Sequence, residues 1–77
     1  MTTVITSLPF VIANPGHFVL GKDLEYDAVG GTAIWIRSKY VIYDSKKFNI
    51  RIGRETTGLY IDEGCNPEIV SSSFSSR

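Results

Sequence analysis

Apolar and polar residues alternate in short runs along this chain, and one pattern of three runs occurs twice. At each of its three positions the pattern returns after 25 or 26 residues. The runs are residues 33–36, 41–43 and 48–50, followed by residues 58–61, 67–69 and 74. Alternation with a period of two predicts half-buried strands. Short strands that return after a constant interval are typical of a solenoid, in which each strand stacks on its counterpart.

The residues before this repeat also read as short strands and turns. Residues 4–12 are mostly apolar but contain Pro9, which predicts an edge strand or a bent strand. Asn14-Pro15-Gly16 is a turn signal, because proline sets φ and glycine tolerates positive φ. No segment of ten or more residues has a helical period. The sequence therefore predicts an all-β fold in one module, residues 1–77, with a cap region at 1–31 and coils at 32–77.

Inward positions of successive coils should form a shared apolar column. The expected stacked pairs are Ile34 with Leu59, Ile36 with Ile61, and Phe48 with Phe74. The expected interior residues are Ile34, Ile36, Val41, Phe48, Ile50, Leu59, Ile61 and Ile69. Trp35 and Tyr60 occupy outward positions one repeat apart, so we expect one above the other. Residues 71–77 fit either a flexible tail or a further strand, and the position of Phe74 favours the strand.

These segments give the chain a family resemblance that covers nearly its whole length. The carrying segments are residues 5–12, 15–24, 31–36, 40–44, 48–50 and 58–66. With these runs the chain resembles the N-terminal region of right-handed parallel β-helix proteins of the pectate-lyase-like superfamily. The resemblance implies an N-terminal cap and about one and a half to two coils. At the corner after Asp44 a lysine stands where the family often has a turn glycine, so the geometry of this corner is an open point.

Length and composition narrow the class of function. The chain has 77 residues, with eight basic and eight acidic residues, so no net charge directs it to nucleic acid or to anionic lipid. Its one cysteine, Cys65, cannot form an intramolecular disulfide, and no second thiol is present for a metal site. We find no signal peptide or membrane-spanning run, and we therefore expect cytoplasmic synthesis.

No set of residues has the pattern of a catalytic or metal site. Asp62 and Glu63 are adjacent in a predicted turn, where they should point apart as solvated charges. Asp44 follows a strand end and reads as a turn former. His17 lacks an accompanying nucleophile, and Cys65 lies near acids that disfavour a thiolate. We therefore expect a non-enzymatic protein without a cofactor or metal.

A solenoid buries its core by stacking neighbouring repeats, and about three repeats are normally needed. The last coil should therefore expose apolar residues at an open end, which either a longer chain or another subunit covers. The candidate partner-binding residues are Trp35, Tyr60, Leu59, Ile61, Ile69 and Phe74. We expect a structural or assembly module that docks on identical or different subunits, with a minor virion component as one form of it.

Two alternatives stay open at this point. The chain could be the N-terminal portion of a carbohydrate-binding or polysaccharide-degrading β-helix protein, in which outward rings such as Trp35 and Tyr60 stack on sugars. It could also be a truncated remnant with no independent role.

Overall fold

The computed structural model describes residues 2–76, and these residues form ten short β-strands. No helix occurs in this range, which confirms the all-β prediction. The strands are β1 (Thr2–Ile5), β2 (Phe10–Ile12), β3 (Gly16–Leu20), β4 (Leu24–Tyr26), β5 (Thr32–Ile36), β6 (Val41–Asp44), β7 (Ile50–Ile52), β8 (Thr57–Ile61), β9 (Glu68–Ser71) and β10 (Phe74–Ser76).

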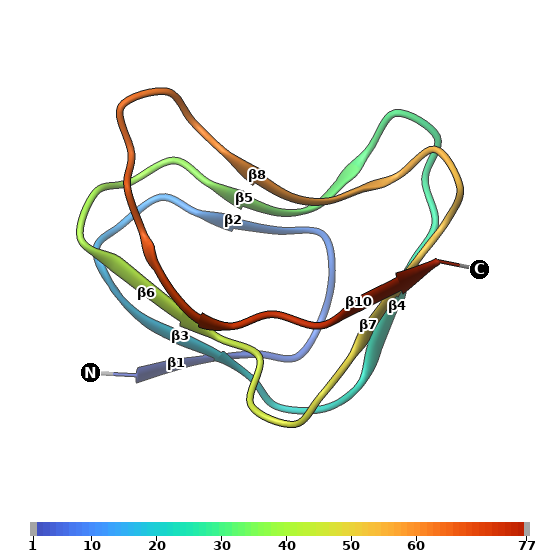
Figure 1. The fold of residues 1–77 in the computed structure, drawn as a ribbon, viewed down its shortest axis with the longest axis horizontal. Coiled ribbons are helices and arrows are strands. Elements are labelled where there is room, and N and C mark those ends of the chain that lie inside the picture. The colour runs from blue at the N-terminus through green and yellow to red at the C-terminus, as the bar shows by residue number, and fades with distance from the viewer. Residues whose placement is uncertain (1, 77) are drawn as a thin grey trace.

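The strands are arranged in three parallel sheets that the chain visits in a fixed rotation. The first sheet has the order β1-β3-β6-β9, the second β2-β5-β8, and the third β4-β7-β10. Every neighbouring pair in these sheets is parallel. From β2 onward the chain passes through the second, first and third sheets in turn, three times over. Figure 1 shows the resulting stacked loops.

The strand register confirms the repeat in the second and first sheets. Ile34 pairs with Leu59, Trp35 with Tyr60, and Ile36 with Ile61. Pairing also extends into the region expected to be a cap, because Phe10 of β2 lies opposite Ile34. Strand β1 pairs with β3 at a shorter separation along the sequence than the other pairs, with Thr2 opposite His17. Only β2 lies between β1 and β3, so the chain bypasses the third sheet there and the interval is shorter.

The expected stacking of Phe48 on Phe74 is wrong. Phe74 pairs with Ile50 in the third sheet, and Phe48 lies in the corner before β7. The reason is a difference in corner length. Residues 45–49 connect β6 to β7, whereas residues 72 and 73 alone connect β9 to β10. The shorter second corner brings Phe74 forward to the first position of its strand. Residues 74–76 are a strand and not a tail.

Inward side chains of the three sheets meet in one apolar core. Its fully or nearly fully buried members are Ile5, Ile12, Phe18, Leu20, Ala33, Ile34, Ile36, Val41, Tyr43 and Ile50. Of the expected interior residues, Ile34, Ile36, Val41 and Ile50 are buried, and Phe48, Leu59 and Ile69 pack partly buried against them. Ile61 has the expected register but is 38% exposed, because no strand within residues 2–76 covers it on the far side from Ile36.

Candidate functional site

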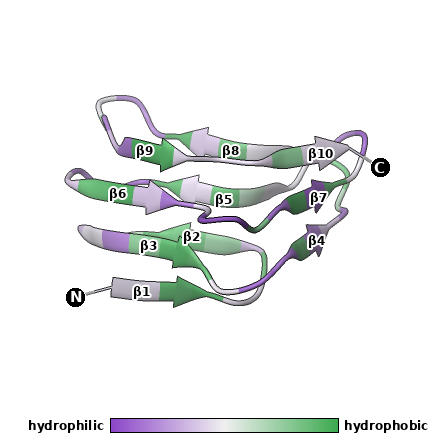
Figure 2. Cartoon of the chain, turned by 60° about the horizontal axis from the view of Figure 1, so that its bottom comes forward, coloured by the Kyte–Doolittle hydropathy of each residue, from purple (hydrophilic) through white to green (hydrophobic). Residues whose placement is uncertain are grey.

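The strands β8, β9 and β10 form one end of the stack, which we call the terminal layer. Within the described residues each of them pairs with a neighbour on one side only. Figure 2 shows the three strands together at the end opposite β1. The inward residues Leu59, Ile69 and Phe74 are half-buried, whereas their partners in the layer beneath are buried. This layer therefore combines apolar side chains with strand edges that have unpaired backbone groups.

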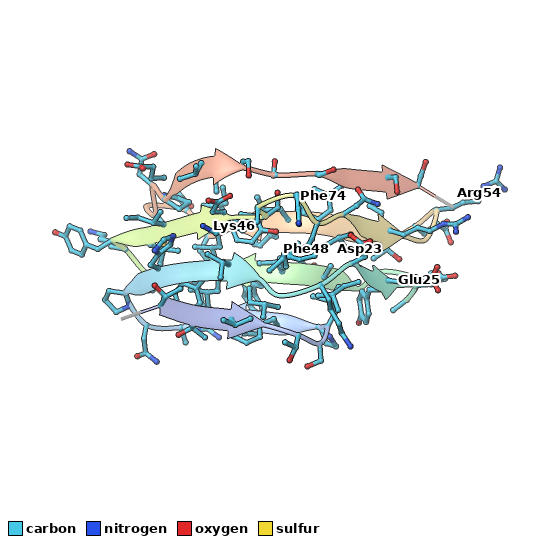
Figure 3. All side chains as sticks on the ribbon, turned by 90° about the horizontal axis from the view of Figure 1, so that it is seen from below. Asp23, Glu25, Lys46, Phe48, Arg54 and Phe74 are labelled. Atoms are coloured by element: carbon cyan, nitrogen blue, oxygen red, sulfur yellow. The ribbon has the colours of Figure 1, made fainter. Side chains whose placement is uncertain are left out.

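Phe74 lies across the inner side of this layer and partly fills it. A Cβ atom added to Gly58 would lie 2.7 Å from Cδ1 of Phe74, so the ring packs directly on the glycine backbone. Figure 3 labels Phe74 and Phe48, which come from successive turns of the chain. The aromatic ring thus covers part of the terminal layer, but Ile61 remains open to solvent. Sequence reasoning missed this contact, since it depends on the register of β10.

The opposite end of the stack is closed. Ile5 of β1 and Ile12 of β2 are 0% exposed although their strands are edge strands. Leu8 and Phe10 pack against the core nearby, and the Phe10 ring meets the Phe18 ring edge-to-face at 6.1 Å. The turn between β1 and β2 therefore carries a side chain that helps to cover this end. Phe10, Leu24 and Tyr26 are half-buried here, so the two ends differ chiefly at Ile61, which is 38% exposed where Ile12 is 0% exposed.

Trp35 and Tyr60 lie on the outer face of the second sheet, as the sequence predicted. Their rings are 6.3 Å apart with planes inclined by 63°, so they do not offer two parallel faces. The indole Nε1–H of Trp35 donates a 2.6 Å hydrogen bond to Oδ1 of Asp62. The guanidinium of Arg37 lies 4.8 Å from the Trp35 ring centroid. Trp35 is therefore engaged within the chain, and Tyr60 (51% exposed) is the more accessible ring.

Asp62 is not simply a solvated turn charge, because it accepts this bond from Trp35. The only sign of this hydrogen bond in the sequence was the spacing of Trp35 and Asp62, which are one repeat and two further positions apart. Glu63 is exposed, as expected. The adjacent pair thus has two different environments, and neither resembles a two-carboxylate catalytic site.

Asp44 is the centre of a polar cluster at the corner between the first and third sheets. Its Oδ1 accepts the Ser71 hydroxyl at 2.7 Å and the Lys46 backbone N–H at 2.8 Å. These two bonds lower the pKa of the Asp44 carboxyl below its usual value, and the bond from Ser71 has the larger effect. Lys46 has a φ of 57°, so it supplies the left-handed residue of this corner in place of a glycine. The structural role expected for Asp44 fits these contacts.

A shallow depression lies on the outer face of the third sheet. It is lined by Asp23, Leu24, Glu25, Asn49 and Arg51. The Asn49 backbone N–H donates to Asp23 at 2.8 Å, and Arg51 Nε lies 4.0 Å from a Glu25 oxygen. Figure 3 shows Asp23 and Glu25 on this side of the molecule. The depression holds donors and acceptors but no aromatic side chain.

The other candidate residues lie apart from one another. His17 lies on β3 and its Nδ1 is 3.5 Å from the Thr2 hydroxyl, while Cys65 lies half-buried in the turn before β9. Across residues 2–76 no group of three or more His, Cys, Asp and Glu side chains could hold a metal ion. A helix long and apolar enough to cross a membrane is likewise not found in this part of the chain.

The chain was compared with protein-family models, with curated proteins and with solved structures, and none of them matches it.

Proposed function

We propose that the three sheets constitute a right-handed parallel β-helix and that the protein is a non-enzymatic assembly module. Three features support the proposed fold: every strand pair is parallel, the sheets are visited in rotation, and most registers repeat every 24–26 residues. The proposed helix has three turns, β2-β3-β4, β5-β6-β7 and β8-β9-β10, and β1 lies beneath the first. This is more than the one and a half to two coils that the family resemblance implies. Right-handed connections are the norm between parallel strands of one sheet.

The observation that supports the assembly function is the exposure of the last side chain in one column of stacked inward residues. Ile12, Ile36 and Ile61 are stacked in β2, β5 and β8, and their exposed fractions are 0%, 0% and 38%. A solenoid completes its core by adding a further layer, and an uncovered layer with free strand edges is a template for another polypeptide. In this proposal, protein subunits supply the missing layer.

Tyr60 extends the proposed contact surface onto the outer face of β8. It lies beside the free edge of that strand and half of its surface is exposed. A subunit that covers the terminal layer would reach this ring at its rim. Interfaces are enriched in tyrosine because the ring combines a large apolar area with a polar tip. Incorporation into a larger structure such as a virion would be one setting for such a module, by analogy of fold alone.

Hydrogen exchange on the purified chain tests this function. We expect slow amide exchange in β5, β6 and β7, and fast exchange in β8, β9 and β10 of the isolated molecule, because edge strands open locally. Assembly should slow exchange in the terminal layer specifically. A dispersed monomer whose terminal-layer amides are as protected as those of the middle turn would overturn the proposal, since the chain would then close its own end.

A second candidate is carbohydrate binding, which the polar depression on the third sheet favours. Asp23, Asn49 and Arg51 offer the mixed acceptors and donors that sugar hydroxyls require. The absence of an aromatic wall in this depression makes it the weaker candidate. Titration with a panel of neutral and acidic oligosaccharides, followed by amide chemical shifts, tests it. Shifts confined to β4 and β7 that are lost in Asn49→Ala would support the candidate, and no shifts at millimolar sugar would remove it.

A further inference from the structure

The two ends of the stack differ in a way that restricts how copies of the chain could associate. At the β1 end, Ile5 and Ile12 are fully buried beneath the turn that contains Leu8. At the other end, the terminal layer leaves Ile61 38% exposed, with Leu59 and Ile69 half-buried beside it. Each copy therefore has an exposed inward isoleucine at the terminal layer, whereas the inward isoleucines at the β1 end are covered and Phe10, Leu24 and Tyr26 there are half-buried.

The open end is also one of the two broadest faces of the molecule. The backbone measures 31 × 26 × 17 Å, and Figure 1 looks down the shortest axis, along which the turns are stacked. An elliptical face of 31 by 26 Å has an area of roughly 600 Å², which approaches the roughly 800 Å² that each partner buries in a standard stable interface. A second copy of the chain presents a face of the same outline and size.

Charge does not assist contact between two such faces, so the apolar side chains must provide it. The inward residues of the terminal layer, Leu59, Ile61, Ile69 and Phe74, are all apolar. Residues 57–76 also contain three acids, Asp62, Glu63 and Glu68, and no lysine or arginine. The free edges of β8, β9 and β10 add backbone donors and acceptors around this apolar centre. Apolar centres with polar rims are the usual anatomy of stable interfaces.

We propose that the protein forms a two-fold symmetric dimer through the terminal layer of each copy. This inference rests on the assembly function proposed above and names its partner as a second copy of the same chain. A dimer is favoured over a filament because head-to-tail growth would press the open layer against the sealed β1 end. When each copy has one open face, the self-complementary arrangement is isologous and closes after two subunits.

The two-fold symmetry sets the direction of the facing strands. Turning one copy over reverses the direction in which its chain circulates, so strands that meet across the interface run antiparallel. Antiparallel edges can satisfy each other's backbone groups as in an ordinary sheet. The dimer thereby removes the free edges of the terminal layer from both copies at once.

Light scattering across a range of chain concentrations, with circular dichroism, tests the dimer. The wild-type chain should approach a mass of about 17 kDa, twice the 8.5 kDa of one chain, and grow no further. Ile61→Lys places a charge at the open face where the side chain is already partly exposed, so the monomer should keep its β-sheet spectrum. Its dimer dissociation constant should rise by at least about 30-fold, since a buried unpaired charge is costly at an interface.

Val4→Lys and Val29→Lys are the matched controls. Val4 lies on β1 at the sealed end and is 52% exposed, and Val29 lies in a corner and is 80% exposed. Both variants should dimerise as the wild type does. Equal loss of dimer in Val4→Lys and Ile61→Lys would overturn the proposal, as would species that grow with concentration beyond two chains.

Hydrogen exchange separates failure of the dimer from failure of the assembly function. A wild-type monomer at all concentrations, with fast exchange in β8, β9 and β10, would overturn self-association but leave a different subunit as the partner. A monomer with slow exchange in these strands would overturn both proposals.

Discussion

The hydroxyl of Ser71 donates a 2.7 Å hydrogen bond to Oδ1 of Asp44 and so joins β9 to β6 at the point where their register shifts. The same oxygen accepts the backbone N–H of Lys46, and Ser45 lies 3.2 Å from Ser71 between hydroxyl oxygens. This polar corner fastens the terminal layer to the turn beneath it. An edge strand of the terminal layer is thus held by a carboxylate.

Acid should loosen this corner. The Ser71 and Lys46 bonds lower the pKa of the Asp44 carboxyl in the folded chain. A group whose folded pKa is depressed adds stability above its unfolded pKa, and this stability is lost as pH falls through the folded pKa. We therefore expect the free energy of unfolding to fall below about pH 4, with faster amide exchange in β9 as the first sign. Urea denaturation between pH 7 and 2 measures this dependence.

Ser71→Ala is the informative control for the acid effect. It removes the largest cause of the pKa shift but keeps the carboxylate and the Lys46 N–H bond. The variant should be less stable than the wild type at pH 7, and the difference should shrink toward pH 2. A difference that is constant with pH would show that Ser71 acts by packing alone.

Removal of one buried hydroxyl should stabilise the protein. The Tyr43 side chain is 0% exposed, and within residues 2–76 its hydroxyl oxygen has no hydrogen-bond partner. Burying an unpaired hydroxyl costs about 1–3 kcal/mol in mutational series. Tyr43→Phe should therefore raise the free energy of unfolding by about 1 kcal/mol in urea denaturation. A loss of stability would indicate that the hydroxyl has a partner, such as an ordered water.

The same residue gives a test at alkaline pH. Burial, with a contribution from the Asp44 charge, raises the pKa of Tyr43 to about 12. The stability linked to a raised pKa is fully present below the unfolded value of about 10 and is lost as pH rises toward the folded value. Wild type should therefore lose stability between about pH 10 and pH 12. The Tyr43→Phe variant should lose less over this range, which thermal melts at stepped pH can measure.

Periodicity in the sequence predicted the parts of this fold that repeat, and missed the parts that depend on corner length. Ile34, Trp35 and Ile36 were paired correctly with their counterparts because β5 and β8 are joined by an uninterrupted repeat. Phe48 was paired wrongly because the corner before Phe74 is shorter than the corner that contains Phe48. Alternation reports which face a residue occupies, but the number of residues in a turn sets the register.

The exposed end was predictable, but its contacts were not. The sequence led us to expect that the last coil exposes Leu59 and Ile69 end-on, and the structure leaves both half-buried. The Trp35–Asp62 and Ser71–Asp44 hydrogen bonds join residues that no short motif connects. Side-chain pairs across corners depend on the path of the backbone, which composition and spacing do not specify.

Gly58 should tolerate no larger residue while Phe74 is present. An added Cβ would meet the ring at 2.7 and 2.9 Å, and overpacking of this kind costs about 1–3 kcal/mol. Gly58→Ala should therefore destabilise the chain by about that amount in urea denaturation. In the Phe74→Leu background the same change should cost clearly less, because the ring that it strikes is gone. Equal costs in both backgrounds would place the effect in the glycine backbone instead of in the ring contact.

The hydrogen bond between Trp35 and Asp62 should contribute measurably to stability and to fluorescence. Trp35 is the only tryptophan, so the tryptophan emission comes from the side chain that makes this contact. Asp62→Ala should shift the emission and lower the free energy of unfolding by about 1.5 kcal/mol, the low end for a bond to a charged group. Asp62→Asn keeps an acceptor oxygen and should lose less. Identical spectra in all three proteins would argue that the bond does not form in solution.

The stacked isoleucines provide a test of the open end within the single chain. Ile36→Val deletes a methylene from a fully buried side chain, and this should cost about 0.5–1.5 kcal/mol. Ile61→Val deletes the same group where the side chain is partly exposed, and should cost only a few tenths of a kcal/mol in dilute solution. At concentrations where the chain associates, the cost at Ile61 should rise toward that at Ile36, because the partner then buries it. Equal costs in dilute solution would mean that Ile61 is already covered in the monomer.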